Sequence, residues 1–122
     1  MQIIPTEAEE QIALFQWAEF AKAQYPELAL LFHVPNGGSR HQIEAARLKA
    51  QGVKPGVPDI FLPVPRGGYH GLFIELKRQK GGRLSNNQKI WLTALGGMGY
   101  AVYVCFGCEE AIKEIIKYLG RK

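Results

Sequence analysis

Two carboxylates and a lysine form the part of this sequence best suited to chemistry. Asp59 is the only aspartate in the chain, and fifteen residues separate it from the triplet Glu75-Leu76-Lys77. Carboxylate oxygens are ligands that suit Mg²⁺ or Mn²⁺. If Asp59 and Glu75 lie on neighbouring strands, they form such a site, with the backbone carbonyl of Leu76 as a further ligand. Lys77 is then placed to orient a water molecule or to stabilise charge developing on a phosphate.

Taken alone, the same pattern is also typical of solvated charges on a half-exposed strand. Three neighbouring features favour a functional site. The turn Gly56-Val57-Pro58 fixes the direction of the backbone at Asp59, and Gln88 opens the helix that follows the Glu75 strand. A third feature is a set of flanking basic residues: Lys54, Arg78, Lys80 and Arg83.

The pattern of apolar and turn residues predicts that two strands joined by a hairpin carry the carboxylates. The first strand runs from Asp59 to Val64, and the second covers Tyr69–Lys77. Because side chains alternate between the two faces of a strand, Glu75 and Lys77 leave from the same face. Antiparallel pairing of the two strands therefore brings Asp59 beside Glu75.

Two helices are predicted by pairs of residues with the spacing of a capping box. Thr6 and Glu9 begin a helix over 7–24, and Ser85 and Gln88 begin one that ends near residue 95. The other predicted elements are a strand over 28–34, a helix over 41–51, a strand over 100–106 and a helix over 109–119. The last strand follows a helical crossover, which favours parallel pairing with the Glu75 strand. The sequence thus predicts one domain over residues 1–122, of mixed α/β class, with a small mixed sheet flanked by helices.

Three segments together resemble the PD-(D/E)XK nuclease pattern, and more narrowly the VRR-NUC family of virus-type replication–repair nucleases. They are Gly56-Val57-Pro58-Asp59, Glu75-Leu76-Lys77 and Leu84-Ser85-Asn86-Asn87-Gln88. The resemblance covers nearly the whole chain, from Thr6 to Leu119. It implies a restriction-endonuclease-like core and metal-dependent hydrolysis of phosphodiester bonds, with a 5′-phosphate on the product. Standalone members in phages are single small domains of this kind.

The resemblance also implies roles for individual residues. Asp59 and Glu75 would be ligands of Mg²⁺ or Mn²⁺, and Lys77 would be the catalytic lysine. Gln88 matches a motif glutamine close to the active site.

The family also has an acidic residue on its first helix. Glu7, Glu10 and Gln11 share one helical face by their spacing. The order Glu7-Ala8-Glu9 best matches the family pattern, so Glu7 is our prediction and Glu10 is the alternative. Acidic residues at a helix start also stabilise the helix dipole, and for any single one of these glutamates this is the better explanation.

Positive charge is concentrated in the middle of the chain. Residues 33–89 hold ten Lys and Arg against three acidic residues, a net charge of +7, whereas residues 1–32 have a net charge of −4. Such a stretch is either an ordinary solvated surface or a surface for a polyanion. The predicted DNA contacts are Arg40, Lys54, Arg78, Lys80 and Arg83. Arg40 follows Asn36-Gly37-Gly38-Ser39, which is either a phosphate-binding loop bordering the site or a plain turn.

Two other functions fit parts of the sequence. A nucleic-acid-binding module without catalysis would use the same basic surface, although the acid, acid and lysine positions are all retained. A thiol oxidoreductase would use Cys105 and Cys108, which have redox-motif spacing but follow the last strand rather than an early one. His33, His41 and His70 lack the spacing of zinc ligands and fit structural or phosphate-facing positions.

The expected protein is therefore a metal-dependent, structure-selective DNA endonuclease, with four-way (Holliday) junctions as the favoured substrate. Two symmetric cuts at a junction need two active sites, so a homodimer is expected. The first helix carries Phe15, Trp17 and Phe20, which is more apolar surface than one small core buries. The chain starts without a signal-peptide pattern, so a cytoplasmic location is expected, with a phage or prophage as one source.

Overall fold

Among the described residues, four strands form one sheet, and helices lie on both of its faces. The computed structural model describes residues 3–35 and 42–122. In chain order the elements are helix α1 (Glu7–Ala21), the 3₁₀ helix η1 (Pro26–Leu30), strand β1 (Phe32–His33), helix α2 (Gln42–Ala50), strands β2 (Ile60–Leu62) and β3 (Leu72–Lys77), helix α3 (Asn86–Gly97), strand β4 (Ala101–Phe106) and helix α4 (Cys108–Leu119). The mixed α/β class predicted from the sequence is confirmed. No helix among the described residues has the length and apolar content needed to cross a bilayer.

The sheet has the strand order β1-β2-β3-β4. β1 pairs with β2 and β2 pairs with β3 in antiparallel fashion, with Ile60 opposite Ile74. β3 and β4 are parallel, with Glu75 opposite Val104. The predicted parallel pairing is thus confirmed, and α3 supplies the crossover that such a pair requires.

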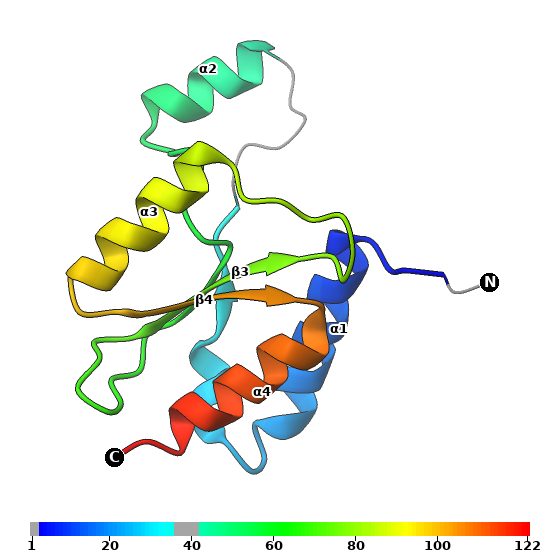
Figure 1. Cartoon of the computed structure of the whole chain (residues 1–122), viewed down its shortest axis with the longest axis vertical. Coiled ribbons are helices and arrows are strands. Elements are labelled where there is room, and N and C mark those ends of the chain that lie inside the picture. The colour runs from blue at the N-terminus through cyan, green and yellow to red at the C-terminus, as the bar shows by residue number, and fades with distance from the viewer. Residues whose placement is uncertain (1–2, 36–41) are drawn as a thin grey trace.

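The helices divide between the two faces of the sheet (Figure 1). α1 and α4 pack against each other and cover one face, and α3 covers the other face near β4. α2 lies beyond α3, away from the sheet. The carboxyl ends of β3 and β4 lie near the start of α1, and the loop after β3 leads from this end of the sheet back to α3.

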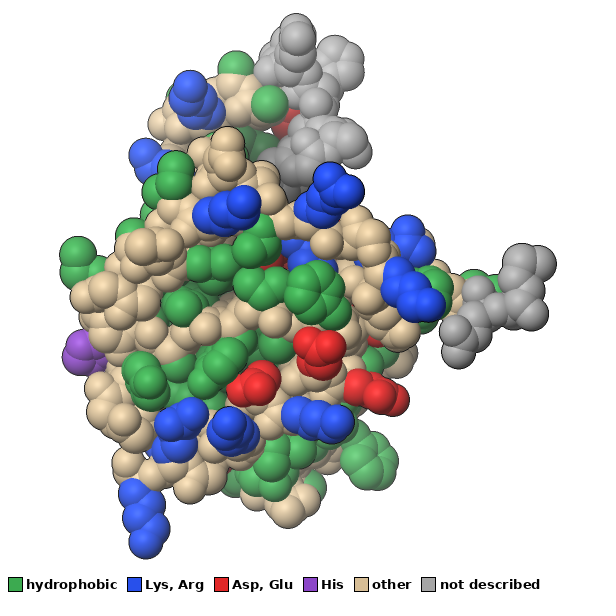
Figure 2. All heavy atoms as spheres, in the orientation of Figure 1, with side chains coloured by type: hydrophobic (Ala, Val, Ile, Leu, Met, Phe, Trp, Pro, Cys, Tyr) green, Lys and Arg blue, Asp and Glu red, His purple; other side chains and the backbone are tan. Residues whose placement is uncertain are grey.

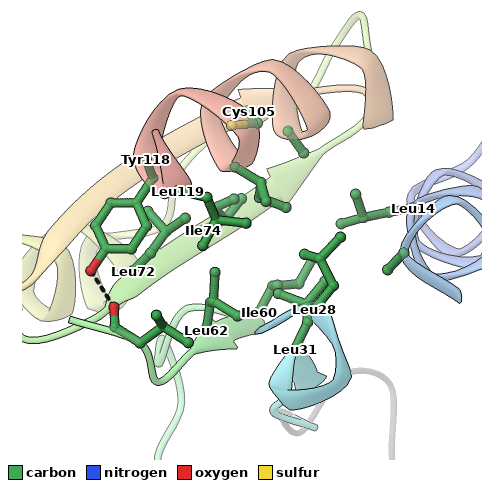
Figure 3. Close-up of a cluster of buried hydrophobic side chains, with 14 of the residues drawn as sticks. Leu14, Leu28, Leu31, Ile60, Leu62, Leu72, Ile74, Cys105, Tyr118 and Leu119 are labelled. Atoms are coloured by element: carbon green, nitrogen blue, oxygen red, sulfur yellow. Dashed lines mark hydrogen bonds between the residues drawn. The ribbon is translucent and has the colours of Figure 1, made fainter. Parts of the chain in front are cut away.

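The main core lies between the sheet and the α1–α4 layer (Figure 3). Leu14 from α1, Ile60 and Ile74 from the sheet, and Ile115 from α4 are all at most 1% exposed. Tyr118 is also buried, and its hydroxyl donates a hydrogen bond to the carbonyl oxygen of Val64. The strand residues that face this core alternate with residues that face away, which leaves the second face free to carry polar groups.

The prediction of a strand over residues 28–34 is largely wrong. Pro26 starts the 3₁₀ helix η1, and this turn buries Leu28 and leads the chain back along α1. Only Phe32–His33 pairs with β2. A continuous apolar run does not distinguish a strand from a tight turn whose side chains are buried on one side, and here the run forms a turn that packs against α1. The hairpin strands are also shorter than predicted, beginning at Ile60 and Leu72.

Candidate active site

Asp59 and Glu75 meet at the end of the sheet where β2 begins. Ile60 lies opposite Ile74, so the next position in this register sets Asp59 opposite Glu75. Asp59 Oδ1 accepts a hydrogen bond of 2.9 Å from the backbone N–H of Leu76. Since the N–H and C=O of one strand residue point to the same side, the carbonyl oxygen of Leu76 also faces the Asp59 edge. The three predicted metal ligands are therefore neighbours.

A tight turn fixes the approach of the chain to Asp59. Gly56 has a φ of +94°, and a Cβ at this position would lie 2.5 Å from the carbonyl carbon of Asn87. Only glycine allows the turn to pack this closely against the start of α3. Pro58, directly before Asp59, is fully buried. The turn thus joins the Asp59 strand to the helix that carries Gln88.

Glu75 and Lys77 are buried although both are charged side chains. Glu75 is 3% exposed and Lys77 is 6% exposed. Lys77 Nζ lies 3.8 Å from Glu75 Oε2, and Gln88 Nε2 donates a hydrogen bond of 3.2 Å to the same oxygen. The other oxygen, Glu75 Oε1, is buried and accepts no hydrogen bond from the described residues. Buried polar atoms are rarely left without a partner, so this oxygen marks a place where a ligand is expected.

Gln88 has two roles that depend on each other. Its Oε1 accepts the backbone N–H of Ser85 at 2.8 Å, and its own N–H is bonded to Ser85 Oγ at 3.1 Å, which completes the capping box of α3. With Oε1 held by the cap, the amide nitrogen of Gln88 must point away from Ser85, and it points to Glu75. The helix start therefore orients a donor toward the carboxylate.

Burial raises the pKa values of both carboxylates, and neighbouring negative charge adds to this. Burial raises the pKa of Asp59 to about 6, against the lowering effects of the Leu76 N–H and the charge of His33. Burial also raises the pKa of Glu75 to about 8, and the negative charge of Asp59 adds to this, while Lys77 opposes it. The charge of Glu7 raises both values. Raised pKa values that arise from burial and from neighbouring carboxylates are typical of functional sites.

These residues fit a divalent cation that prefers oxygen ligands. The buried Glu75 carboxylate, one oxygen of which has no partner among the described residues, lies beside the partly buried carboxylate of Asp59 and the backbone carbonyl of Leu76. A cation would remove the repulsion between the carboxylates. The described residues contain no cluster of three His, Cys, Asp or Glu side chains close enough to hold a metal ion. Carboxylate and carbonyl oxygens are the ligands that Mg²⁺ and Mn²⁺ prefer, so Asp59, Glu75 and the Leu76 carbonyl could hold such a cation.

The structure separates the two candidate acids of the first helix. Glu10 is 4% exposed, accepts a hydrogen bond of 2.9 Å from Gln79 Nε2 and accepts another of 3.1 Å from the backbone N–H of Cys108. Gly107, at the N-cap of α4, has no side chain to satisfy that N–H, so Glu10 takes the place of a cap. Glu7 is exposed, and its charge acts on Asp59 and Glu75. The geometry therefore favours Glu7 over Glu10 as the acidic neighbour of the site.

The partners of Glu10 and the contact between His33 and Asp59 were not predicted from the sequence. His33 Nδ1 lies 2.8 Å from the carbonyl oxygen of Asp59, 26 residues along the chain. The signal for Glu10 was the glycine at the start of the last helix, which leaves an N-terminus without a local cap. The sequence contains no comparable signal for His33.

The predicted DNA-contact residues that lie in the described part of the chain are all exposed. They are Lys54, Arg78, Lys80 and Arg83. In Figure 2 basic side chains lie over the start of α3 and the loop that follows β3. Arg40 and the segment before it lie outside the described residues.

The two cysteines do not form a reactive pair. Both are free thiols, and burial raises the pKa of Cys105 to about 12. Burial also raises the pKa of Cys108, and the charges of Glu10 and Glu109 add to this. Because the thiolate is the reactive form, raised pKa values argue against a thiol oxidoreductase.

Comparisons with known proteins identify the family of the chain. The profile of the VRR-NUC domain matches residues 3–109. A solved structure described as a VRR_NUC domain protein is 31% identical, with a TM-score of 0.79, over 97% of this chain and 90% of that chain. A search of curated proteins found no match. The matched range includes the whole acidic site, from the first helix to the last strand. The chain belongs to the VRR-NUC domain family and has its nuclease-type fold.

Proposed function

We propose that the protein is a metal-dependent DNA endonuclease whose active site is formed by Asp59, Glu75 and Lys77. The observation that carries the proposal is the buried Glu75 carboxylate with one oxygen free of partners beside Asp59. A buried carboxylate beside a second, partly buried carboxylate destabilises a fold. A site that keeps this arrangement inside a nuclease-type fold is best explained by the cation that the carboxylates would bind.

Each side chain has a distinct part in this mechanism. Asp59, Glu75 and the carbonyl of Leu76 would hold the cation, which when bound supplies a Lewis acid and lowers the pKa of coordinated water. Lys77 stabilises negative charge that develops on the scissile phosphate, or orients the attacking water. Gln88 holds Glu75 in place through the hydrogen bond to Oε2. Glu7 contributes negative charge at the margin of the site.

DNA is the proposed substrate because the surface near the site is basic. Residues 33–89 have a net charge of +7, and Arg78, Lys80 and Arg83 follow directly on the strand that carries Glu75 and Lys77. Lys and Arg side chains neutralise backbone phosphates without reading sequence. This favours recognition of DNA shape, and among shaped substrates we propose the four-way junction.

A homodimer would supply the two active sites that a junction requires. The structure contains one acidic site per chain, and a two-fold axis relates two such sites as the two scissile strands of a junction are related. α1 carries apolar surface that the described chain leaves open, since Phe20 is 88% exposed and Ile12 is 59% exposed. Phe15 and Trp17 are partly buried against the core.

The test is cleavage of labelled four-way junction, flap and linear duplex DNA with Mg²⁺ or Mn²⁺. The expected result is cleavage that depends on the cation, is fastest on the junction and is lost in Glu75→Gln. Glu19→Gln is a matched control, because Glu19 is an exposed glutamate on α1 whose partner is Lys22. If the wild-type protein binds DNA but cleaves none of the substrates, the proposal fails in favour of a non-catalytic nucleic-acid-binding module.

A further inference from the structure

Three hydrogen bonds hold Asp59 in place, and one of them comes from His33. Leu76 N–H donates to the side chain of Asp59 at 2.9 Å. The carbonyl oxygen of Asp59 accepts the backbone N–H of Val34 at 2.7 Å, and His33 Nδ1 lies 2.8 Å from that same oxygen. The side chain and the backbone carbonyl of Asp59 are thus both held by hydrogen bonds.

The chemistry of the partners determines which nitrogen of His33 carries a proton. A carbonyl oxygen only accepts hydrogen bonds, so Nδ1 must be the donor. In the neutral ring Nε2 is then the nitrogen without a proton. The hydrogen bond to Asp59 therefore selects one of the two neutral forms of the ring.

His33 is not needed to satisfy the backbone or to fill the core. The N–H of Val34 already bonds to the Asp59 carbonyl, so that oxygen would not be left without a partner if the ring were removed. The side chain of His33 is exposed, and β1 contributes only two residues to the edge of the sheet. A second donor from an exposed imidazole on a short edge strand indicates a role in the orientation of Asp59.

We propose that His33 is a positioning residue for the acidic site, which acts through the Nδ1–H bond to the Asp59 carbonyl oxygen. This contact fixes the main chain from which the Asp59 carboxylate reaches Leu76 and the cation that it would bind. The inference rests on the proposed function, because it concerns how Asp59 is held for that cation. Groups that hydrogen-bond to metal ligands hold them in their binding geometry, and their loss weakens binding.

Three substitutions distinguish this role from a contact made by Nε2. His33→Asn keeps a donor near the position of Nδ1 and loses Nε2, whereas His33→Gln places its amide near Nε2 and loses the Nδ1 donor. His33→Ala removes both. We expect His33→Ala and His33→Gln to weaken Mn²⁺ binding, measured by calorimetry, by about 10- to 100-fold, and His33→Asn to recover most of it.

His70→Ala is the matched control. His70 is exposed and packs against the ring of Tyr100, so its loss should leave Mn²⁺ affinity and cleavage unchanged. In the His33 variants the loss should also appear in kcat for junction cleavage, with KM for DNA changed little, because the basic surface is intact. A variant that merely loosened β1 would lower the melting temperature without this difference between kcat and KM.

Nitrogen NMR of the metal-free wild-type protein gives a readout that does not depend on cleavage. With the ring neutral, we expect the His33 signals to show a protonated Nδ1 and an unprotonated Nε2. The proposal is overturned by the opposite tautomer, by recovery in His33→Gln instead of His33→Asn, or by wild-type Mn²⁺ affinity in His33→Ala. Failure of the proposed function looks different, since the wild-type protein itself would then neither bind Mn²⁺ nor cleave DNA.

Discussion

Lys77 is the residue whose predicted role can be separated most cleanly from that of its neighbours. Its ammonium group lies 3.8 Å from Glu75 Oε2 but is not a metal ligand. We expect Lys77→Ala to lower kcat by about 10²- to 10³-fold, the effect of losing one group that stabilises the transition state, and to leave Mn²⁺ affinity close to that of the wild type.

Steady-state cleavage and calorimetric titration measure the two quantities separately. Lys113→Ala, on the exposed side of α4, controls for the loss of one positive charge. If Lys77→Ala loses metal binding and turnover to the same degree, Lys77 supports the fold of the site and has no separate part in the reaction.

The raised pKa values of the two carboxylates predict how the stability of the metal-free protein depends on pH. Asp59 and Glu75 have folded-state pKa values of about 6 and about 8, against ordinary values of 3.8 and 4.5. The folded state therefore binds more protons than the unfolded state in this window, and the free energy of unfolding falls as pH rises from about 4 to 8. Thermal unfolding in a chelator should show this fall, and Glu75→Gln should show a smaller one.

Added Mn²⁺ should reverse the trend, because a cation binds the deprotonated carboxylates and competes with protons. We expect the stabilisation by Mn²⁺ to be larger at pH 8 than at pH 5. Equal falls in the wild-type protein and in Glu75→Gln would show that Glu75 is not responsible for the pH dependence.

At the residue scale, much of the site could be predicted because it depends on local spacing. Strand alternation places Glu75 and Lys77 on one face, and a short hairpin sets Asp59 opposite Glu75. The roles of Glu10 and His33 could not be predicted in this way. Glu10 bonds to a residue 98 positions away, and such a contact depends on how the helices pack.

At the scale of the elements, the turn before β2 packs closely against the start of α3. Gly56 and Gly52 have nearly the same φ, +94° and +98°, but only Gly56 has backbone atoms of another element where a Cβ would lie. Gly52→Ala should therefore cost about 1–2 kcal/mol of stability through backbone strain alone. Gly56→Ala should cost clearly more and should also weaken Mn²⁺ binding, because it separates Asn87 from the turn that leads to Asp59.

Urea unfolding and calorimetric titration of the two variants check this prediction. Equal losses of stability, with Mn²⁺ affinity intact in both, would show that the close approach of the turn to α3 does not support the site.

The elements that were predicted well are those with caps or with regular apolar periods. Both capping boxes formed as expected, at Thr6 and at Ser85. The strand prediction failed between Pro26 and Val34. The apolar residues there have no regular period, and packing against α1 decided between strand and turn. Propensity is a weak guide where tertiary contacts bury a short apolar run.

At the scale of the whole molecule, the basic surface predicts a strong effect of salt on DNA binding. A few phosphate contacts give a slope of roughly −3 to −6 when log affinity is plotted against log salt. Replacing Arg78, Lys80 and Arg83 by Gln should reduce the size of this slope by up to about 3. Fluorescence anisotropy with labelled junction DNA measures the slope, and replacing Lys113 and Lys117 on α4 by Gln is the control. A slope near zero in the wild type would exclude the basic stretch as the DNA surface.

The proposed dimer predicts a mass near twice 13.6 kDa in solution. Phe20→Glu should yield a folded monomer that binds DNA but cuts junctions poorly, because Phe20 is 88% exposed and its loss does not disturb the core. Light scattering after size exclusion gives the mass, and circular dichroism confirms folding. A wild-type monomer that cleaves junctions at a rate first order in protein would contradict the dimer.

The contacts of Glu10 make one end of the sheet depend on the order in which the segments of the chain are synthesised, which the topology alone does not require. Its carboxylate joins the first helix to Gln79, just beyond the strand of Glu75 and Lys77, and to Cys108 at the start of the last helix. During synthesis Glu10 is made before Cys108, which lies 98 residues further along the chain. A chain whose synthesis stalls before α4 lacks this connection and the helix that packs against β4. Glu10 is then either buried with only one of its two partners or exposed to water. The contacts that join α1 to this end of the sheet are therefore completed only after the start of α4 has been made.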